Sequence, residues 1–332
     1  MKAPIISFCY NRYDHLEKSL ASLLANPEAS ETDLIVFSDG ARGIMDSSKV
    51  DAVRQYLNTI SGFKSVTVIQ RKANYGCALN IIDGIDQVMK DDRYESAVIM
   101  EDDIVVSSTF LSFINKALDF YQSDKMVWSV SGVSPKYLEL NTDEKLAIWR
   151  NSECWGWATW ADRWQQFSKN SEEVMSQLTV EKRNQWDHGG LIGYSPQVEM
   201  NQDGRANTWA IFWSYLVFKN QGLIVQPTQT MVENIGRDGS GIHADGTLQE
   251  NGPKRKLSEK KDWSLPVVAK ENSKLVQLIL SELSCRDSEL ESTPVRLEEK
   301  KNKTTLQKIK RETLRAFKDI CPPVVFRMFG LK

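Results

Sequence analysis

The first 125 residues alternate between two hydrophobic periods, and this alternation constrains the fold more than any other feature. Short apolar runs rich in β-branched residues occupy 4–9, 34–39, 65–70 and 96–100, and each is followed by a segment with helical spacing. Four strand-then-helix units in a row predict an α/β protein, with a mostly parallel, doubly wound sheet flanked by helices. Such a sheet binds its ligand at the carboxyl ends of its strands.

Three consecutive acids, Glu101, Asp102 and Asp103, follow the fourth predicted strand. Acids can cap a following helix, but Ser107 or Ser108 is better placed to cap the next one. Adjacent carboxylates repel each other, so we expect a divalent cation to hold them together. Hard oxygen ligands favour Mg²⁺ or Mn²⁺, which commonly share their coordination with substrate phosphates. The triplet therefore predicts a site for a metal-bound diphosphate.

The other strand ends carry polar residues that suit a nucleotide. Arg12, Arg71 and Lys72 are cations able to meet phosphate oxygens, and Asp39 is an acceptor for the N–H of a nucleobase. The sequence has no G-x-x-x-x-G-K-[ST] loop, which argues against a P-loop ATPase. No G-x-G-x-x-G follows the first strand, which argues against a dinucleotide-dependent enzyme.

The second half of the chain is rich in tryptophan, with eight of the ten tryptophans between residues 145 and 215. Indole rings can stack on sugar rings, but they also build cores, and we expect about five or six of the eight to be packing residues. The segment 207–222 predicts a buried helix that stops at a glycine. Residues 223–243 predict a strand pair leading into a glycine-rich loop.

The C-terminal part differs in charge. Residues 1–243 hold 23 Lys and Arg against 31 Asp and Glu, whereas residues 244–332 hold 19 against 13. Residues 244–303 read as a charged linker with one helix near 272–285. Residues 304–332 predict a basic amphipathic helix with a short apolar tip, a helical extension that fits a peripheral anchor on an anionic membrane. The alternative is a helix that packs onto its own domain.

Cellular location follows from composition. The five cysteines form no C-x-x-C pair, which fits a reducing compartment. No apolar run is long enough for a signal peptide or a membrane span. We expect a cytoplasmic protein, bound peripherally at the inner membrane surface through 304–332. No nucleic-acid partner is predicted, because the basic residues lie beside apolar ones rather than along an aromatic groove.

Six motifs in order carry a resemblance to a known family: "ISFCYNR", "FSDGAR", "RKANYGCALNI", "VIMEDDIVVSSTFL", "VWSVSG" and "ECWGWATWADRW". Residues 3 to about 243 are similar to nucleotide-sugar glycosyltransferases of the GT-A fold. The likeness is greatest to bacterial family 2 enzymes and their distant relative N-acetylglucosaminyltransferase I. It implies a GT-A domain over 1–243, with a nucleotide-binding half (1–125) and an acceptor half (126–243).

The resemblance also implies a reaction. A hexose or N-acetylhexosamine would pass from a nucleotide sugar, expected to be a UDP-sugar, to a surface glycan such as a lipid-linked oligosaccharide. The transfer would depend on Mn²⁺ or Mg²⁺ and would invert the sugar carbon.

Residue roles carried over at matching positions are expectations of the resemblance. Asp103 would ligate the metal, with His243 as a further metal or phosphate ligand. Glu101 and Asp102 would contact sugar, ribose and metal-bound water, Asp39 would pair with uracil, and Arg12 would lie near the diphosphate. Asn74 and Gly76 would belong to a turn over the nucleotide, and Gly156 and Trp157 would lie beside the donor sugar. Arg71 stays a candidate phosphate contact on its position at a strand end alone.

The catalytic base is where the resemblance ends. N-acetylglucosaminyltransferase I has its base in a W-D-D-W segment, and the nearest match here, "TWAIFW", has Ala210 and Ile211 in place of the acids. Asp203 and Glu153 are the available carboxylates, and we place Asp203 first.

Other readings stay open at this point. The mismatch allows a retaining mechanism, or a non-catalytic relative that binds glycans or acts as a scaffold. A sugar nucleotidyltransferase would need a G-x-G-T-R type loop after the first strand, which "CYNRYDHLEK" lacks.

Overall fold

The structure, a computed structural model, describes residues 2–134, 145–236, 238 and 255–281. Apart from residues 280 and 281, the described residues belong to one compact unit, Met1–Ile279. Its centre is an eight-stranded sheet in the order β3-β2-β1-β4-β8-β6-β9-β7.

The N-terminal half of the sheet is parallel, as the alternating pattern predicted. Its strands are β1 (Ile5–Cys9), β2 (Asp33–Ser38), β3 (Ser65–Gln70) and β4 (Ser96–Glu101). The register pairs Phe8 with both Phe37 and Glu101, so these strands end at a common edge. Because β1, β2 and β4 are mostly buried on both faces, each reads as a continuous apolar run.

The other half of the sheet is mixed. Its strands are β6 (Val127–Ser131), β7 (Leu146–Trp149), β8 (Trp157–Trp160) and β9 (Leu223–Pro227). β8 runs antiparallel to both β4 and β6, β9 is parallel to β6, and β7 is antiparallel to β9. A separate pair, β5 (Ile104–Val106) with β10 (Val232–Asn234), is antiparallel.

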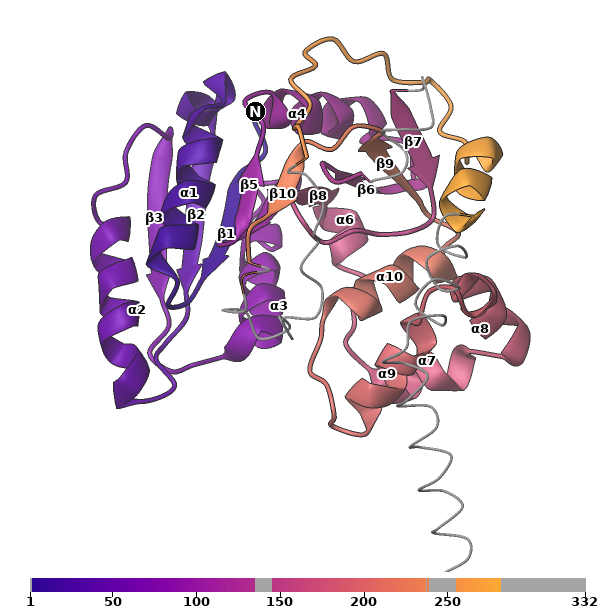
Figure 1. Ribbon diagram of the computed structural model, residues 1–332, viewed down its shortest axis with the longest axis horizontal. Helices are drawn as coiled ribbons and strands as arrows, with labels where there is room; N and C mark the ends of the chain where they lie inside the picture. Colours follow the sequence, from indigo (N-terminus) through magenta and orange to yellow (C-terminus); the bar gives the residue numbers. More distant parts are fainter. Residues whose placement is uncertain (1, 135–144, 237, 239–254, 282–332) are drawn as a thin grey trace, which may run out of the picture. The chain divides into compact units, whose positions relative to one another are not determined.

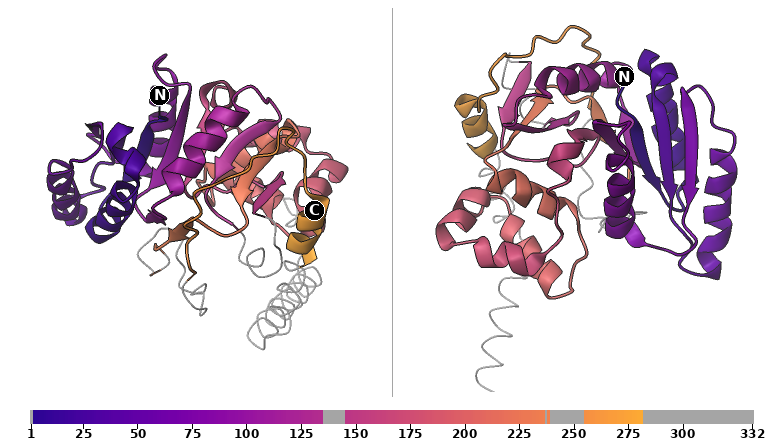
Figure 2. Two further views of the ribbon diagram at one scale, coloured as in Figure 1. Left: turned by 90° about the horizontal axis from the view of Figure 1, so that it is seen from above. Right: turned by 180° about the vertical axis from the view of Figure 1, so that it is seen from behind.

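Helices cover both faces of the sheet (Figures 1 and 2). One core contains residues of α1 (Tyr13–Leu24), α2 (Ile44–Leu57) and α4 (Phe110–Tyr121). The core of the other face contains residues of α3 (Gly76–Met89), α6 (Ala161–Trp164) and α10 (Ala210–Lys219). The α/β, GT-A-like prediction is confirmed. The serine cap expected for α4 is wrong, because Thr109 is the N-cap residue and makes no capping side-chain bond.

A helical lobe lies beside the mixed half of the sheet, at the lower right of Figure 1. It consists of α7 (Ser171–Gln177), α8 (Val180–Trp186), the 3₁₀ turn η2 (His188–Gly190) and α9 (Tyr194–Gln202), packed against α10. A further 3₁₀ turn, η1 (Pro27–Glu31), follows α1. Val174, Trp186 and Phe212 are members of the separate core of this lobe.

The tryptophans pack more completely than expected. Seven of the eight between residues 145 and 215 are buried, and only Trp155 keeps intermediate exposure. Packing therefore involves all eight, since Trp155, though only partly buried, also packs against the core.

Residues 255–279 are part of the sheet domain rather than free of it. Trp263 is 4% exposed, and its ring centroid lies 4.6 Å from that of Phe113. The amide of Ser258 donates to the carbonyl of Thr230 at 2.7 Å, and residues 273–281 are helical. Within the predicted linker 244–303, residues 255–279 are therefore a packed segment of the domain. The predicted tail, 304–332, lies outside the described residues.

Within the described part of the chain, no helix has both the length and the apolar character needed to cross a membrane.

Candidate functional site

The acid triplet lies at the turn between β4 and β5, at the carboxyl edge of the parallel strands. Arg12, which follows β1, reaches across to it. Its Nη2 donates to Asp102 Oδ1 and, at 2.8 Å, to Asp103 Oδ2, while its Nε lies 3.4 Å from Asp102 Oδ2. These contacts form an Arg12–Asp102–Asp103 cluster where β1 and β4 end.

One donor of this cluster is unused. Arg12 Nη1 is buried and has no hydrogen-bond partner among the described residues. A buried N–H without a partner is costly, and a guanidinium edge matches the geometry of phosphate oxygens. The cluster can therefore accept one more anionic oxygen.

The glycine-rich segment after β10 begins directly over this cluster. The amide of Ile235 donates to the Asp103 carbonyl at 2.8 Å. A Cβ on Gly236 would clash with Asp103 Oδ2 and lie 3.0 Å from Arg12 Nη1. Asp238 Oδ2 is 3.2 Å from Nε2 of His15 on α1. Only a residue without a side chain fits between this segment and the acids.

The buried carboxyls hold their protons more tightly than usual. Burial, followed by repulsion from Asp103 and Asp102, raises the pKa of Glu101 to about 8. Burial also raises the pKa of Asp102 to about 6, even though the attraction of Arg12 opposes the rise. Added positive charge at this edge would stabilise the ionised forms.

The donor chemistry of this edge fits Mg²⁺ or Mn²⁺. No three His, Cys, Asp or Glu side chains converge into a complete metal cage in the described ranges. Mg²⁺-type sites, however, commonly use one or two carboxylates plus substrate phosphates. Asp103, whose side chain is 14% exposed, and the spare Nη1 of Arg12 are the groups available for that arrangement.

Asp39, expected to face the nucleobase, instead holds a turn. Its Oδ1 accepts from the amides of Gly40 and Tyr75, and its Oδ2 from the amide of Gly76 and the side chain of Asn74, at 2.7 to 3.1 Å. Four donors fill the acceptor sites of this carboxylate. Asp39, Asn74 and Gly76 therefore do come together, and the carboxylate fixes the turn that enters α3.

Arg71 is likewise committed inside the protein. Its guanidinium lies between the rings of Phe37 and Tyr75, 4.8 and 4.6 Å from their centroids. It donates to Asn80 at 3.1 Å and forms an ion pair with Asp83. With 7% exposure, it positions Tyr75 rather than presenting a charge to solvent.

The segment before β8 arrives at the same edge as the acids. Trp157 pairs with Ile99, and β8 is antiparallel to β4, so the residues preceding Trp157 pass the residues that follow Ile99. Gly156 has φ +56°, and a Cβ at this position would lie only 2.8 Å from Val232 Cγ2 of β10. Trp157 itself is fully buried among Trp164, Trp209 and Trp213, so its indole lies in the core and not beside a sugar.

The two candidate bases differ in surroundings. Glu153 lies in the segment that passes the acids, and burial raises its pKa to about 7. Asp203 caps α9 in the helical lobe, is 56% exposed and forms an ion pair with Arg205 at 2.7 Å. The sequence placed Asp203 first, and the structure gives reason to reverse that order. His243 lies outside the described residues.

Two residues near the acids were not singled out from the sequence. Gly236 lies within the glycine-rich loop predicted in 223–243, and its position over Asp103 depends on the β5–β10 pairing, which local periodicity does not reveal. Cys77, at the start of α3, has its Sγ 4.0 Å from Glu101 Oε2. Its place in "NYGCALN" was the available signal.

A family model, described as the GNT-I family, matches residues 1–170, half of the chain. The chain belongs to the GNT-I family. This GNT-I family protein is accordingly a nucleotide-sugar glycosyltransferase. Among the curated protein sequences, none matches the chain significantly.

Solved structures similar to this GNT-I family member have low sequence identity. The mannosyltransferase PcManGT of Pyrobaculum calidifontis, in complex with GDP-Man and Mn²⁺, is 14% identical with a TM-score of 0.40, over 66% of this chain and 72% of that one. GalNAc-T7 with UDP, GalNAc and Mn²⁺ is 9% identical with a TM-score of 0.42, over 70% and 43%. S. aureus TarS 1–349 with UDP-GlcNAc is 16% identical with a TM-score of 0.30, over 44% and 39%. The chain thus spans less than half the length of the GalNAc-T7 and TarS chains.

Proposed function

We propose that this GNT-I family protein moves a hexose or N-acetylhexosamine from a UDP-sugar to a surface glycan, such as a lipid-linked oligosaccharide, with inversion and with Mn²⁺ or Mg²⁺. The observation that carries the proposal is the Arg12–Asp102–Asp103 cluster, with its unpartnered Nη1, at the carboxyl edge of the sheet. This edge is where open α/β sheets bind nucleotides.

The chain's own residues supply the grip on the donor. Arg12 Nη1 would donate to a phosphate oxygen, and Asp103 would hold the metal. A divalent cation there stabilises the negative charge that develops on the departing diphosphate. Asp39 shapes the nucleoside site indirectly, because its four hydrogen bonds fix the turn from Asn74 to Gly76.

Glu153 is the proposed base. A carboxylate with a pKa near 7 is substantially ionised at neutral pH and still basic enough to take a proton in the transition state. It would accept the proton of the attacking hydroxyl while the new C–O bond forms. The bond from the sugar carbon to the phosphate oxygen breaks, and UDP leaves with that electron pair.

A donor screen tests the function. Purified protein is incubated with a panel of UDP-, GDP- and TDP-sugars, with Mn²⁺ or with a chelator, and free nucleoside diphosphate is measured. We expect release from one class of UDP-sugar only with metal, a loss of at least about 100-fold in Asp103→Asn, and no loss in Asp92→Asn, whose side chain is exposed. Full release in the presence of chelator would refute the proposal.

A non-catalytic relative is the second candidate, and one observation favours it. Ala210 and Ile211 replace the acids of the W-D-D-W segment, and Ile211 is buried in the core of the lobe. Under this reading UDP would bind with Mn²⁺, yet no nucleotide sugar would be hydrolysed or transferred.

For the C-terminal segment we propose a membrane role on the sequence alone. Lys308, Lys310 and Arg311 lie in a basic amphipathic stretch suited to an anionic lipid surface. Deleting 304–332 should abolish sedimentation with anionic vesicles and leave UDP binding unchanged, and neutral vesicles are the control. Sedimentation that persists after the deletion would reject the anchor.

A further inference from the structure

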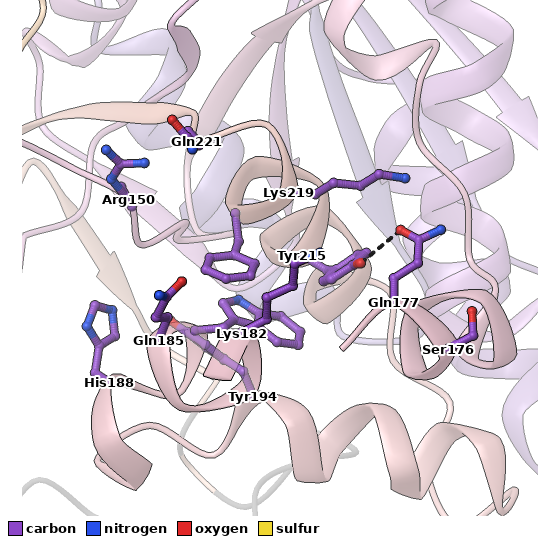
Figure 3. A pocket seen from close by; sticks show the side chains of 12 residues that line it. Arg150, Ser176, Gln177, Lys182, Gln185, His188, Tyr194, Tyr215, Lys219 and Gln221 are labelled. Carbon is purple, nitrogen blue, oxygen red and sulfur yellow. Dashed lines mark hydrogen bonds between the residues drawn. The ribbon is translucent and has the colours of Figure 1, made fainter. Parts of the chain in front are cut away.

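The helical lobe contains a hollow of about 860 Å³ that the proposed donor site does not use (Figure 3). It is lined from α7, α8, η2, α9, α10 and the residues that follow β7 and α10. None of the lining residues belongs to the Arg12–Asp102–Asp103 cluster or to the turns beside it. Its volume is within the range of about 300 to 1,000 Å³ of small-ligand sites.

Aromatic rings form the floor of this hollow. Trp186 is a buried lining residue, and its indole N–H donates to Ser214 Oγ at 3.2 Å. The rings of Tyr194 and Phe218 flank Trp186, with centroids 5.4 and 6.0 Å from it, and both are only half-buried. Partly exposed rings held in place by a buried one offer a firm apolar surface to a sugar ring.

The charge on the wall is positive. Arg150, Lys182 and Lys219 line the hollow, and no carboxylate is among the lining residues (Figure 3). Arg150 forms an ion pair with Glu271, with 3.3 Å between Nε and Oε2, and Lys219 forms one with Glu173, with 3.8 Å between Nζ and Oε1. Lys182 makes no ion pair with any residue that the structure describes. The hollow therefore complements an anion.

Amide side chains add hydrogen-bonding groups to the same wall. Gln177 accepts from the hydroxyl of Tyr215 at 3.0 Å, which orients it, and Gln185 and Gln221 also line the hollow. Hydroxyl-rich ligands need groups that both donate and accept, and a glutamine amide supplies both.

The backbone gives an independent reason to consider these side chains functional. In the described part of the chain, the non-glycine residues with positive φ are His188, at +48°, and Gln221, at +52°, and both line this hollow. Gln221 follows α10, in a position where helices usually place glycine; its amide donates to the Phe218 carbonyl at 3.0 Å. Glycine would relieve the strain, so the side chain is retained at a cost in stability.

We propose that this hollow binds an acidic saccharide, with a sugar ring against Tyr194 and Phe218 and its carboxylate or phosphate group facing Lys182, Lys219 and Arg150. The proposal rests on the proposed function in one respect: the saccharide would be part of the acceptor glycan, held away from its reacting end. Binding to the hollow does not itself require nucleotide or metal.

Calorimetric titration of the full chain tests the proposal with defined probes. The probes are a galacturonate tetramer for carboxylates, glucose 6-phosphate for a phosphate ester, maltotetraose as the neutral match and inorganic phosphate as the bare anion. We expect an acidic sugar to bind at least tenfold more tightly than maltotetraose and inorganic phosphate, and the better of the two acidic probes identifies the anionic group.

Two variants locate the binding. Lys182→Gln combined with Lys219→Gln should weaken binding of the acidic sugar at least tenfold, whereas Lys49→Gln, an exposed lysine on α2, should leave it unchanged. Gln221→Gly should raise the melting temperature and at the same time weaken binding at least threefold. A change that stabilises the fold cannot lose affinity by unfolding.

Several results would overturn the proposal. They are equal affinity for maltotetraose or for inorganic phosphate, unchanged affinity in the double lysine variant, or a self-association of the chain that this double variant abolishes. The donor site is tested separately by titrating UDP with Mn²⁺. Saccharide binding without UDP binding refutes the donor site alone, and the reverse result refutes the hollow alone.

Discussion

Arg12 partly neutralises the three neighbouring acids at the edge of the sheet. Its guanidinium contacts Asp102 and Asp103 and leaves Nη1 without a partner among the residues that the structure describes, so one positive charge faces three carboxyls. The remaining imbalance appears in the pKa of Glu101, which burial and its acidic neighbours raise to about 8. A donor site that brings in a metal and a diphosphate would resolve that imbalance.

Glu153 makes a prediction about stability and pH. Burial raises its pKa from 4.5 to about 7 in the folded protein. Between pH 4.5 and about 7, Glu153 is ionised in the unfolded chain but still protonated in the folded chain. The free energy of unfolding therefore falls as pH rises through this range. Glu153→Gln removes this pH dependence. The free energy of unfolding of the variant, relative to that of the wild type, should therefore rise by as much as about 3 kcal/mol from pH 4 to pH 8.

Urea unfolding at the two pH values measures this difference. Glu181→Gln, the same exchange at an exposed position on α8, is the matched control. A Glu153→Gln difference as flat as that of the control would mean that Glu153 titrates normally, and its role as a base would lose its physical support.

At the scale of elements, the small β5–β10 pair joins the two parts of the site. β5 continues from the acid triplet, and β10 runs antiparallel to it, so the chain after Asn234 passes over Asp103. The two segments are more than 120 residues apart in sequence, and their pairing places a glycine where a side chain would meet the acids.

Gly236→Ala should therefore damage the donor site. The added methyl group would displace the Asp103 carboxylate from Arg12, and we expect affinity for UDP with Mn²⁺ to fall at least about tenfold. Gly193→Ala is the control, since a Cβ there meets nothing within 4 Å. Unchanged UDP affinity in Gly236→Ala, measured by calorimetry, would separate this loop from the donor.

The sequence predicted the parallel strands and put Arg12 and the acids at strand ends, because buried parallel strands read as apolar runs and polar residues follow them. It did not predict the partners of Asp39 or Arg71, because four donors around one carboxylate come from tertiary contacts. Trp157 looked like a sugar platform by its residue type, yet it lies in a central strand. Asp203 ranked above Glu153 because the antiparallel register of β8 on β4, which directs the segment before Trp157 along the end of β4, is not visible in periodicity.

At the scale of the whole molecule, the sheet domain extends to Ile279. Residues after the glycine-rich region return to the core, and the Tyr121 hydroxyl donates to the Pro266 carbonyl at 2.8 Å. A charged segment can thus be integral to a fold when a few apolar residues anchor it, here Trp263, Leu275 and Ile279.

Trp263→Ala should destabilise the entire domain by about 3 to 5 kcal/mol, because it leaves a cavity against Phe113. Val268→Ala, at a position 74% exposed, should change stability by less than about 0.5 kcal/mol. Urea unfolding followed by tryptophan fluorescence checks both. An early, separate transition for Trp263→Ala with the main transition unmoved would show that 255–279 is only loosely attached.

The most direct test of the account is a calorimetric titration of UDP into the full chain, with Mn²⁺ and with a chelator, for wild type and Asp103→Asn. The account predicts that Mn²⁺ tightens UDP binding to the wild type by at least about tenfold, or about 1.4 kcal/mol, and has no such effect on the variant. Equal UDP affinity with and without the metal in the wild type would contradict it.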